Sequence, residues 1–278
     1  MKIRTYFWEA RIISPFQLRA RQVFRRSPHL YFLVGNAGDI LARELIEREY
    51  NCATQNDPSQ GKRLLVVGSI GHSIRKGDIV CGIGVKTKEI PKASDTPVRV
   101  WAVRGPITYD VFKAAGHDVS TVRFQLDPGL MIRFFVSEAD RVGTPTGAIF
   151  IPHYRERGQY TKGLPKGIRL VDIDNHPRDV AHAILSAELV YSSSLHGIIF
   201  AHALGRPCIF VAPQTKEPML KYEDYFASIG LPMPKPLASI LDVRPSRTPD
   251  SPIDLRYARE DFVWPGLEEL VTHGIVTP

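Results

Sequence analysis

Short apolar runs alternate with amphipathic segments along most of the chain. Uninterrupted apolar runs such as RLLVVG (63–68) are typical of buried parallel strands, whereas DILARELIEREY (39–50) places Ile40, Leu41 and Leu45 on one helical face. Residues 30–34 form either a strand or the end of a loop, and 256–274 a terminal helical element. The same patterns predict strands at 2–8, 63–68, 78–85, 98–103, 147–154, 168–174, 188–192 and 207–212, and helices at 39–50, 105–116, 177–187, 195–204 and 218–230.

The repeated strand–helix alternation predicts an α/β fold of the doubly wound kind. The polar segment 137–147, rich in Gly, Thr and Pro, is the best candidate for a linker. We therefore expect two Rossmann-like domains that face a cleft, residues 1–140 and residues 141–278, with the terminal helical element in the second. The Pro- and Ser-rich stretch 231–252 is expected to form a loop.

The composition is that of an ordinary globular protein, with 44% hydrophobic and 23% charged residues in a chain of 278. No apolar run approaches the roughly 18 residues of a membrane span, and no secretory signal peptide opens the sequence. The three cysteines, Cys52, Cys81 and Cys208, form neither a disulfide framework nor a zinc pattern. A reducing, cytoplasmic location is therefore expected.

The positive charge is concentrated at the start of the chain. Residues 1–26 contain seven basic residues and one acidic residue, a net +6 out of the formal +7 of the whole chain, and aromatic residues lie among them. Such a segment can contact lipid headgroups or a polyanionic ligand, although a solvated face or an oligomer contact would have the same composition. Because no nucleic-acid-binding motif accompanies the charge, we expect no nucleic acid partner.

Gly35, Asn36, Gly38 and Asp39 form a turn that opens the helix predicted at 39–50. Glycines let a backbone approach a ligand closely, and a helix N-terminus favours anions. Asp39 is either the N-cap of this helix or a base that accepts a proton from a substrate hydroxyl. The turn does not follow the GxGxxG pattern, which argues against a dinucleotide site.

Polar side chains also follow other predicted strands, at the edge where open α/β sheets bind ligands. Ser69 and His72 lie in a Gly-rich loop after strand 63–68, and Arg104 ends strand 98–103. The arginine can fork onto a carboxylate or phosphate, or it can form a structural salt bridge. Asp127 precedes a proline and is either a site residue or part of a turn, and His153 ends the strand at 147–154.

The segment SSSLHG carries Ser192, Ser193, Ser194 and His196 from a buried strand into an apolar helix. Serine capping accounts for the hydroxyls, but not for a histidine in the first turn, where the helix dipole disfavours imidazolium. A bound anion beside the ring would raise the pKa of His196 and let it act as an acid.

The order of GN-x-GD, VGS, VRGPIT, DPGL and SSSLHG over roughly residues 34–213 resembles the polysaccharide pyruvyl transferase family, most closely its exopolysaccharide branch of succinoglycan- and xanthan-type enzymes. The resemblance implies a GT-B-like fold. It implies transfer of pyruvate from phosphoenolpyruvate to a sugar of an exopolysaccharide or cell-surface glycan precursor, with formation of a cyclic ketal and release of phosphate. A lipid-pyrophosphate-linked acceptor would suit a protein held peripherally at the inner membrane face through residues 1–26.

The resemblance also implies roles for the candidate residues. His196 would be the acid, and Asp39 or His153 the base; the first domain would hold the acceptor and part of the donor site, and the second the donor. No metal and no cofactor other than the co-substrate phosphoenolpyruvate is expected. The expected donor ligands are Arg104, Ser69, His72, Ser193 and Ser194, and the expected acceptor ligands are Asn36, Gly38 and Asp127.

One departure from the family pattern is Ser194, which stands where a basic residue often precedes the Leu-His pair. Arg104, Arg75 or Lys76 could supply the missing charge. Two alternatives remain at this stage. A nucleotide-sugar glycosyltransferase or epimerase would grip a ribose through a carboxylate such as Glu217, and a non-catalytic glycan-assembly relative would account for Ser194.

Overall fold

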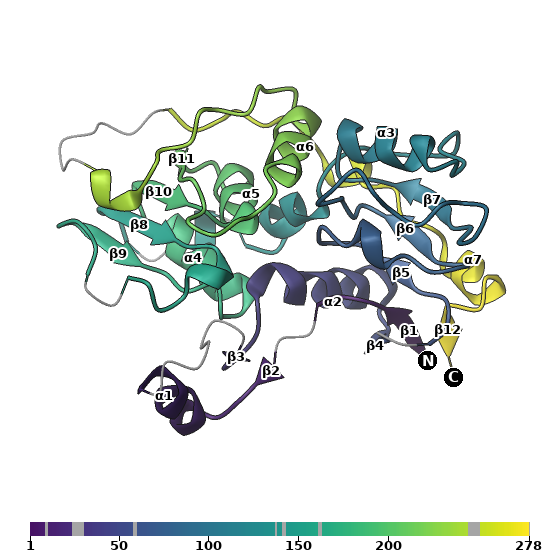
Figure 1. The fold of residues 1–278 in the computed structure, drawn as a ribbon, viewed down its shortest axis with the longest axis horizontal. Helices are drawn as coiled ribbons and strands as arrows, with labels where there is room; N and C mark the ends of the chain where they lie inside the picture. The colour runs from purple at the N-terminus through teal and green to yellow at the C-terminus, as the bar shows by residue number, and fades with distance from the viewer. Residues whose placement is uncertain are drawn as a thin grey trace.

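The computed structural model describes residues 1–8, 11–23, 31–57, 60–136, 138–140, 143–160, 163–243 and 251–277. Within them the chain forms an α/β protein with a six-stranded and a four-stranded sheet, which lie side by side in Figure 1. Every strand pairing in these two sheets is parallel except that of the last strand. The predicted α/β class is therefore confirmed. The expected linker and N-terminal segment fall partly outside the described residues.

The first sheet has the strand order β12-β1-β5-β6-β7, and β4 pairs with β1. The predicted strands 63–68, 78–85 and 98–103 are confirmed, but each is shorter than predicted. Each strand ends early, where the backbone leaves the sheet and enters a loop. The strands are β1 (Lys2–Thr5), β4 (Ala53–Asn56), β5 (Leu64–Leu65), β6 (Ile79–Cys81), β7 (Arg99–Ala102) and β12 (Val276–Thr277).

The second sheet has the order β11-β10-β8-β9. A separate parallel pair joins β2 (Arg11–Ile12) to β3 (Tyr31–Phe32). Residues 30–34 thus contain a strand rather than only a loop. The strands of the second sheet are β8 (Ala148–Ile151), β9 (Ile168–Leu170), β10 (Leu189–Ser192) and β11 (Cys208–Phe210).

The five helices predicted at 39–50, 105–116, 177–187, 195–204 and 218–230 are all present, with ends that differ by up to two residues, whereas α1 was not predicted. α2 buries Ile40, Leu41 and Leu45 as expected for one helical face. Proline occupies the first turn of α3 and α4, where its missing N–H has no intrahelical partner to lose. The α-helices are α1 (Pro15–Val23), α2 (Ala37–Tyr50), α3 (Pro106–Ala114), α4 (Pro177–Leu185), α5 (Leu195–Ala203), α6 (Leu220–Ser228) and α7 (Leu267–Thr272). The short 3-10 segments are η2 (Gly71–Ser73), η3 (Pro128–Phe134), η4 (Glu138–Asp140), η5 (Tyr154–Glu156), η6 (Ile240–Asp242) and η7 (Arg259–Asp261).

Several elements join the two sheets. α2 runs beneath their junction and contacts both α4 and β4 (Figure 1). α6, which follows the second sheet in sequence, packs on α3 of the first, and β12 returns to pair with β1. A boundary at residue 140 therefore separates the strands of the two sheets except for β12, which the sequence analysis grouped with the second domain.

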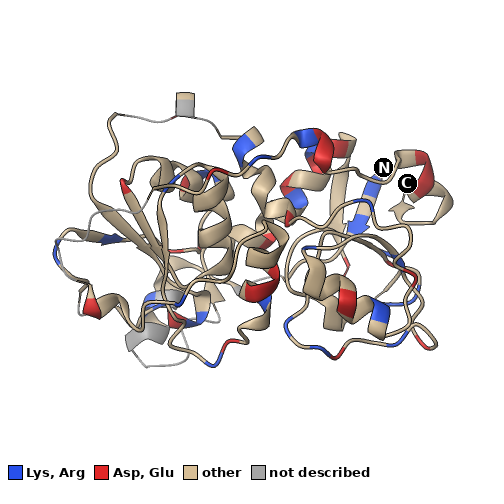
Figure 2. Ribbon diagram, turned by 90° about the horizontal axis from the view of Figure 1, so that it is seen from above, with Lys and Arg blue, Asp and Glu red and all other residues tan. Residues whose placement is uncertain are grey.

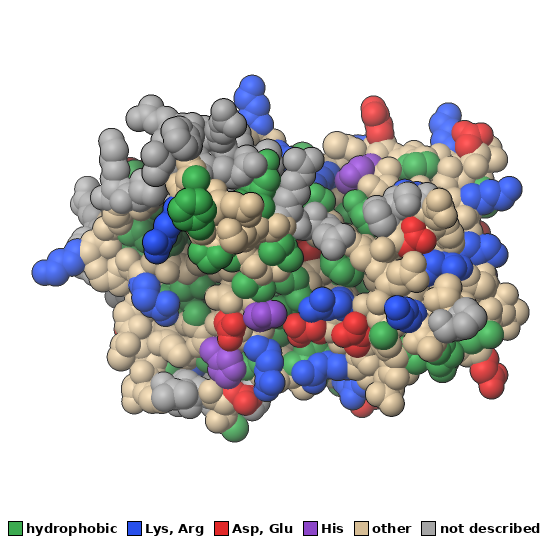
Figure 3. Space-filling model, turned by 90° about the horizontal axis from the view of Figure 1, so that it is seen from below, with side chains coloured by type: hydrophobic (Ala, Val, Ile, Leu, Met, Phe, Trp, Pro, Cys, Tyr) green, Lys and Arg blue, Asp and Glu red, His purple; other side chains and the backbone are tan. Residues whose placement is uncertain are grey.

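Charge is mixed over the described surface. Figure 2 shows basic and acidic residues on the elements of both sheets, and Figure 3 shows them interspersed on the opposite face. This agrees with the near-neutral balance of the chain beyond residue 26. α1 projects from the body in Figure 1, and its Phe16 is 82% exposed.

Candidate active site

A cavity of about 240 Å³ lies where loops from the two sheets meet. Its walls come from the segments that follow the carboxyl ends of β1, β5, β6, β8 and β10, together with the first turns of α2, α5 and α6. This is the edge at which parallel α/β sheets bind ligands. The lining residues are Tyr6, Trp8, Asn36, Asp39, Gly68, Ser69, Ile70, His72, Ser73, Lys86, His153, Tyr154, Arg155, Ser194, Leu195, His196 and Lys221.

The cavity brings together most of the residues singled out in the sequence. The predicted residues among its lining come from four segments that are far apart in the sequence, and the fold brings them together. The predicted residues that line it are Asn36, Asp39, Ser69, His72, His153, Ser194 and His196. The predicted residues that are buried behind its wall are Gly38, Arg104, Asp127 and Ser193.

His196 lies in the first turn of α5, with its ring against the first turn of α2. A Cβ atom added at Gly38 would lie 1.8 Å from Nδ1 of His196, and one at Gly129 would lie 3.7 Å from Cδ2. The two glycines therefore make room for the ring between two elements. Burial, helped by the charges of Lys221 and Arg104, lowers the pKa of His196 to about 3. The imidazole is neutral at neutral pH.

Asp39 faces the same cavity from α2. Burial raises the pKa of its carboxyl to about 7, against the opposing charges of Lys86 and Lys221. The N-cap of α2 is Asn36, whose Oδ1 accepts a hydrogen bond of 3.0 Å from the Gly38 N–H. Asp39 is therefore not the cap, and near neutral pH it exists in both protonation states.

A buried lysine from α6 completes the polar side of the cavity. Nζ of Lys221 lies 2.8 Å from Oε2 of Glu217 and 3.4 Å from Nε2 of His153. Burial lowers the pKa of Lys221 to about 8, although Glu217 opposes the change. Burial and the Lys221 charge lower the pKa of His153 to about 3. Glu217 also accepts from Nη1 of Arg155 at 3.0 Å, so two cations share one carboxylate.

Arg104 does not occupy the place that the sequence predicted for it. Its guanidinium is 1% exposed, pairs with Asp224 at 2.8 Å and donates to Ser69 Oγ at 2.6 Å and to the Val85 carbonyl at 3.0 Å. These contacts match the structural salt bridge that the sequence analysis left open. Arg104 therefore positions Ser69, which does line the cavity.

Two further predicted ligands have structural contacts. Ser193 Oγ accepts from the His153 N–H at 2.8 Å and donates to Glu156 at 2.7 Å. Asp127 accepts from the Gly129 N–H at 2.7 Å as the N-cap of η3, and burial raises its pKa to about 6. Ser193 thus joins the loop that carries His153 to the segment that leads to His196, whereas Asp127 caps η3, which packs on α5.

Ser194 is at the N-cap position of α5, but its hydroxyl makes no capping bond to any described backbone N–H. It lines the cavity together with three basic residues from other segments, Lys86, Arg155 and Lys221. They place positive charge in the same cavity. The cations that the sequence analysis considered for this role lie outside the described cavity lining: Arg75, Lys76 and Arg104.

Sequence reasoning missed Lys221, Lys86 and Arg155. The first belongs to a helix that was predicted correctly, but a single lysine in an amphipathic helix gives no sign of burial. The aromatic residues Tyr6 and Trp8 were noted only for their charged surroundings, yet both line the cavity. Their position at the carboxyl end of a strand was the available signal.

Within the described ranges, no helix is both long and apolar enough to cross a bilayer. Over the same residues, no three or more His, Cys, Asp or Glu side chains are grouped so that they could hold a metal ion.

The fold and the cavity together define an α/β protein whose site combines acid–base groups with cations, one of them the buried Lys221, an arrangement suited to a small anionic substrate. The chain belongs to the polysaccharide pyruvyl transferase family, which matches residues 31–215. The predicted family is thus confirmed, while its exopolysaccharide branch stays a prediction. Membership implies a pyruvate donor and a sugar acceptor.

Two individual proteins are similar to this chain. An uncharacterized protein of Acanthamoeba polyphaga mimivirus is 29% identical over 227 residues, which cover 76% of this chain and 77% of the viral protein. A functionally uncharacterized protein of Klebsiella pneumoniae has a solved structure with a TM-score of 0.44 and 15% identity, covering 77% of this chain and 94% of that one.

Proposed function

We propose that the protein transfers pyruvate from phosphoenolpyruvate to a sugar of an exopolysaccharide or cell-surface glycan precursor, forming a cyclic ketal and releasing phosphate. The observation that carries this proposal is the meeting of Asp39 and His196 with the three cations Lys86, Arg155 and Lys221 around one cavity, in a member of this family. The donor is a small trianion that needs such cations, and the reaction needs an acid and a base.

The donor is held by cations on one side of the cavity. Lys221 and Lys86 face its carboxylate and phosphate, and Arg155 lies at the rim, where its side chain is 45% exposed. This replaces the predicted role of Arg104, whose hydrogen bonds go to the protein. Ser69, His72 and Ser194 remain candidate polar contacts to the donor.

The reaction moves two protons from the sugar. An acid protonates C3 of the enol, the first hydroxyl oxygen bonds to C2 as a base removes its proton, and the second hydroxyl displaces phosphate, which takes the remaining proton. The low pKa of His196 and the raised pKa of Asp39 support an exchange of the two predicted roles, in which Asp39 is the acid and His196 is the base. A bound anion raises both pKa values, so Asp39 keeps its proton, whereas His196 would need a rise of about four units to become charged at neutral pH.

The two-domain, GT-B-like organisation belongs to the same proposal. The division of the cavity between the halves supports it, because Asp39 and Lys86 come from the first half and His153, His196 and Lys221 from the second. In this arrangement the second half supplies two of the three donor cations, Lys221 and Arg155, and the α2 side, with Asn36, faces the acceptor.

The alternative of a nucleotide-sugar enzyme relied on Glu217 to grip a ribose. That carboxylate already accepts from Lys221 and Arg155, and the Lys221 charge keeps its pKa below the ordinary value although burial opposes this. A carboxylate that already accepts from two cations has little capacity to bind the two hydroxyls of a ribose as well. The non-catalytic alternative rested on Ser194, and the three cations that line the cavity weigh against it.

Phosphate release from phosphoenolpyruvate with a panel of methyl glycosides, and calorimetric binding of phosphoenolpyruvate or a UDP-sugar, will test the proposal. We expect the wild-type protein to bind phosphoenolpyruvate and release phosphate with at least one glycoside. Asp39→Asn and His196→Gln should each lower kcat by about 10²-fold or more, the usual contribution of a positioned acid or base. Asp110→Asn, at an exposed position of α3, is the matched control. Binding of UDP-sugars alone, or full activity of both site variants, would overturn the proposal.

We also propose peripheral contact of the N-terminal segment with an anionic membrane at the inner face, where a lipid-pyrophosphate-linked acceptor would be presented. α1 carries exposed Phe16 and Arg19, and Ile12 before it is 60% exposed. Apolar and basic side chains together are typical of interfacial helices. Co-sedimentation with anionic vesicles, reduced in Phe16→Ser and absent with zwitterionic vesicles, is the expected result; equal binding to both would contradict it.

A further inference from the structure

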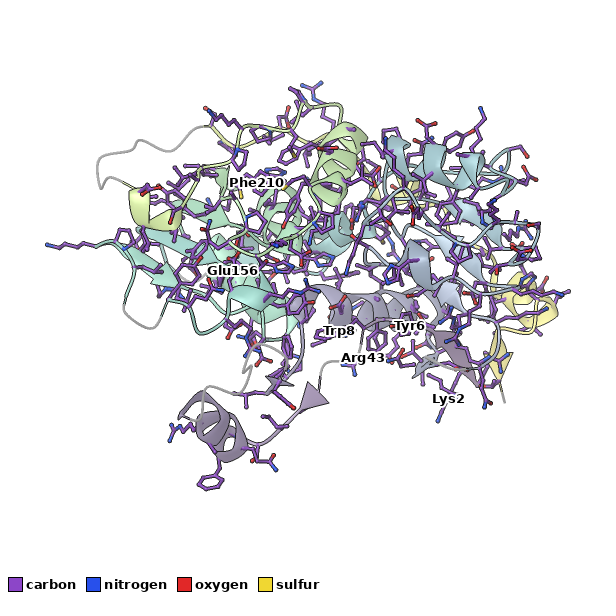
Figure 4. The ribbon with its side chains drawn as sticks, viewed as in Figure 1. Lys2, Tyr6, Trp8, Arg43, Glu156 and Phe210 are labelled. Carbon is purple, nitrogen blue, oxygen red and sulfur yellow. The ribbon has the colours of Figure 1, made fainter. Side chains whose placement is uncertain are left out.

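One wall of the cavity is aromatic, and the proposed reaction chemistry does not use it. Tyr6 and Trp8 follow β1, and Tyr154 begins η5 after β8, so residues from both sheets build this wall. Figures 1 and 4 show the segment that bears Tyr6 and Trp8 crossing α2 from the first sheet toward the second.

The first part of the wall is held by its backbone. Asn56 accepts from the Phe7 N–H at 3.2 Å and donates to the Phe7 carbonyl at the same distance. Phe7 packs against the hydrophobic core, while its neighbours on both sides, Tyr6 and Trp8, line the cavity. This alternation is that of an extended chain. The Arg63 guanidinium lies 5.2 Å from the Tyr6 ring centroid and fixes the ring further.

Trp8 is supported on two sides. Its ring centroid lies 5.2 Å from that of Tyr154 and 5.4 Å from that of Phe32, the latter edge-on. Phe32 is fully buried and is covered by Arg157 at 4.4 Å. Nη2 of Arg157 pairs with Asp174 at 2.5 Å, and this carboxylate also accepts from the backbone N–H groups that lead into α2. Such support keeps the ring in one orientation.

The support does not bury the wall. Tyr6, Trp8 and Tyr154 all remain partly exposed, and all three line the cavity. Phe32, which supports Trp8 from behind, is by contrast fully buried and lines no part of the cavity. The aromatic wall is therefore a preorganised surface for a ligand.

The two kinds of wall fit two kinds of substrate. Phosphoenolpyruvate is a small, highly charged molecule without an extended apolar face, and the cations suit it. A pyranose ring has an apolar face of C–H groups and a polar rim of hydroxyls, and pockets for such ligands combine aromatic surface with a few polar groups. We propose that Trp8 and Tyr154, with Tyr6 beside them, form the subsite on which the acceptor sugar ring stacks, so that its hydroxyl edge faces Asp39 and His196.

This inference rests on the proposed transferase function, but sugar binding can be measured without transfer. Wild-type protein is titrated with methyl pyranosides of glucose, galactose, mannose and N-acetylglucosamine, and tryptophan emission is recorded. At least one glycoside should give a saturable change, and Trp8→Phe should abolish it although Trp101 and Trp264 remain. A response that persists in Trp8→Phe, or no response to any glycoside, would overturn the subsite.

Steady-state kinetics with the responding glycoside gives the second measurement. Trp8→Leu should raise the acceptor KM at least about tenfold, a change equivalent to ~1.4 kcal/mol, while the Kd of phosphoenolpyruvate changes less than about twofold. Trp8→Phe should restore most of the affinity. Phe134→Leu removes a ring from another aromatic pair, with Tyr257, outside the described cavity lining, and should change neither constant.

The outcomes separate the two proposals. Normal transfer with an unchanged acceptor KM in Trp8→Leu refutes the subsite and leaves the transferase function standing. A Trp8-dependent glycoside response in a protein that neither binds phosphoenolpyruvate nor releases phosphate refutes the function and supports the sugar subsite. An equal loss of donor and acceptor affinity, with a lowered unfolding temperature, would mean that Trp8 only supports the fold.

Discussion

Replacing Gly38 by alanine tests directly whether the close approach of α2 to His196 is needed. The added methyl group would lie 1.8 Å from Nδ1, 2.2 Å from Cγ and 2.4 Å from Cε1 of the ring. Non-bonded carbon contacts are most favourable near 3.5–4.0 Å, so the imidazole would have to move by roughly 1.5 Å. Gly129 of η3 lies close to another side of the ring, so the imidazole would have to leave its present position in the cavity wall.

The expected effects on activity and on stability differ in size. A displacement of about 1 Å in a catalytic group can reduce the rate about 10²-fold. The same substitution gains up to about 1 kcal/mol of helix propensity and loses about 1–3 kcal/mol through overpacking. We therefore expect Gly38→Ala to lower kcat by about two orders of magnitude or more, and the free energy of unfolding by no more than about 2 kcal/mol.

Phosphate release from phosphoenolpyruvate and urea denaturation measure the two quantities on the same preparation. Gly266→Ala is the matched control, because no described atom would lie within 4 Å of the new methyl group at the start of α7. It should leave kcat unchanged. A Gly38→Ala protein with wild-type kcat would show that the position of the His196 ring against α2 is irrelevant to the reaction.

Three further predictions concern buried charge. Asp224→Asn leaves Arg104 without its carboxylate, and urea denaturation should reveal a loss of about 3–5 kcal/mol; a loss under about 1 kcal/mol would contradict the buried pair. Lys221→Met should destabilise the protein more than the double variant Lys221→Met/Glu217→Gln, and equal unfolding temperatures would show that the two charges are not coupled. The pKa of Asp39 rises on folding from 3.8 to about 7, so between these two pH values the folded chain binds more protons than the unfolded chain. The stability that the protonated carboxyl contributes at low pH is therefore lost as the pH rises through this range. Urea denaturation from pH 4 to pH 7 should show a flatter pH dependence for Asp39→Asn, and an unchanged slope would refute the shift.

Local chemistry made much of the fold predictable. The apolar runs became parallel strands, and the prolines of α3 and α4 and the buried face of α2 lie where their patterns indicate. The SSSLHG segment does carry a histidine into a cavity at the end of β10. These features depend on neighbours a few residues away, which a single sequence contains.

Contacts between distant segments were not predictable in this way. Arg104 had the right position at a strand end, but its partner Asp224 lies 120 residues away and decides that it is structural. Lys221 becomes a cavity residue only because α6 packs on α3. The acid–base roles likewise depend on burial, which separates the pKa values of Asp39 and His196 and cannot be judged from residue types.

The pairing of β12 with β1 has a consequence for synthesis on the ribosome. Ile3 is opposite Val276, so this part of the sheet needs residues from both ends of the described chain, which lie together in Figure 1. Closing a loop of that length costs roughly 5 kcal/mol in chain entropy. While the polypeptide is still growing, the first half of β1 keeps one unpaired edge, and such edges recruit other strands. A chain that stalls before residue 276 would therefore leave this edge of β1 open to pairing with strands of other chains.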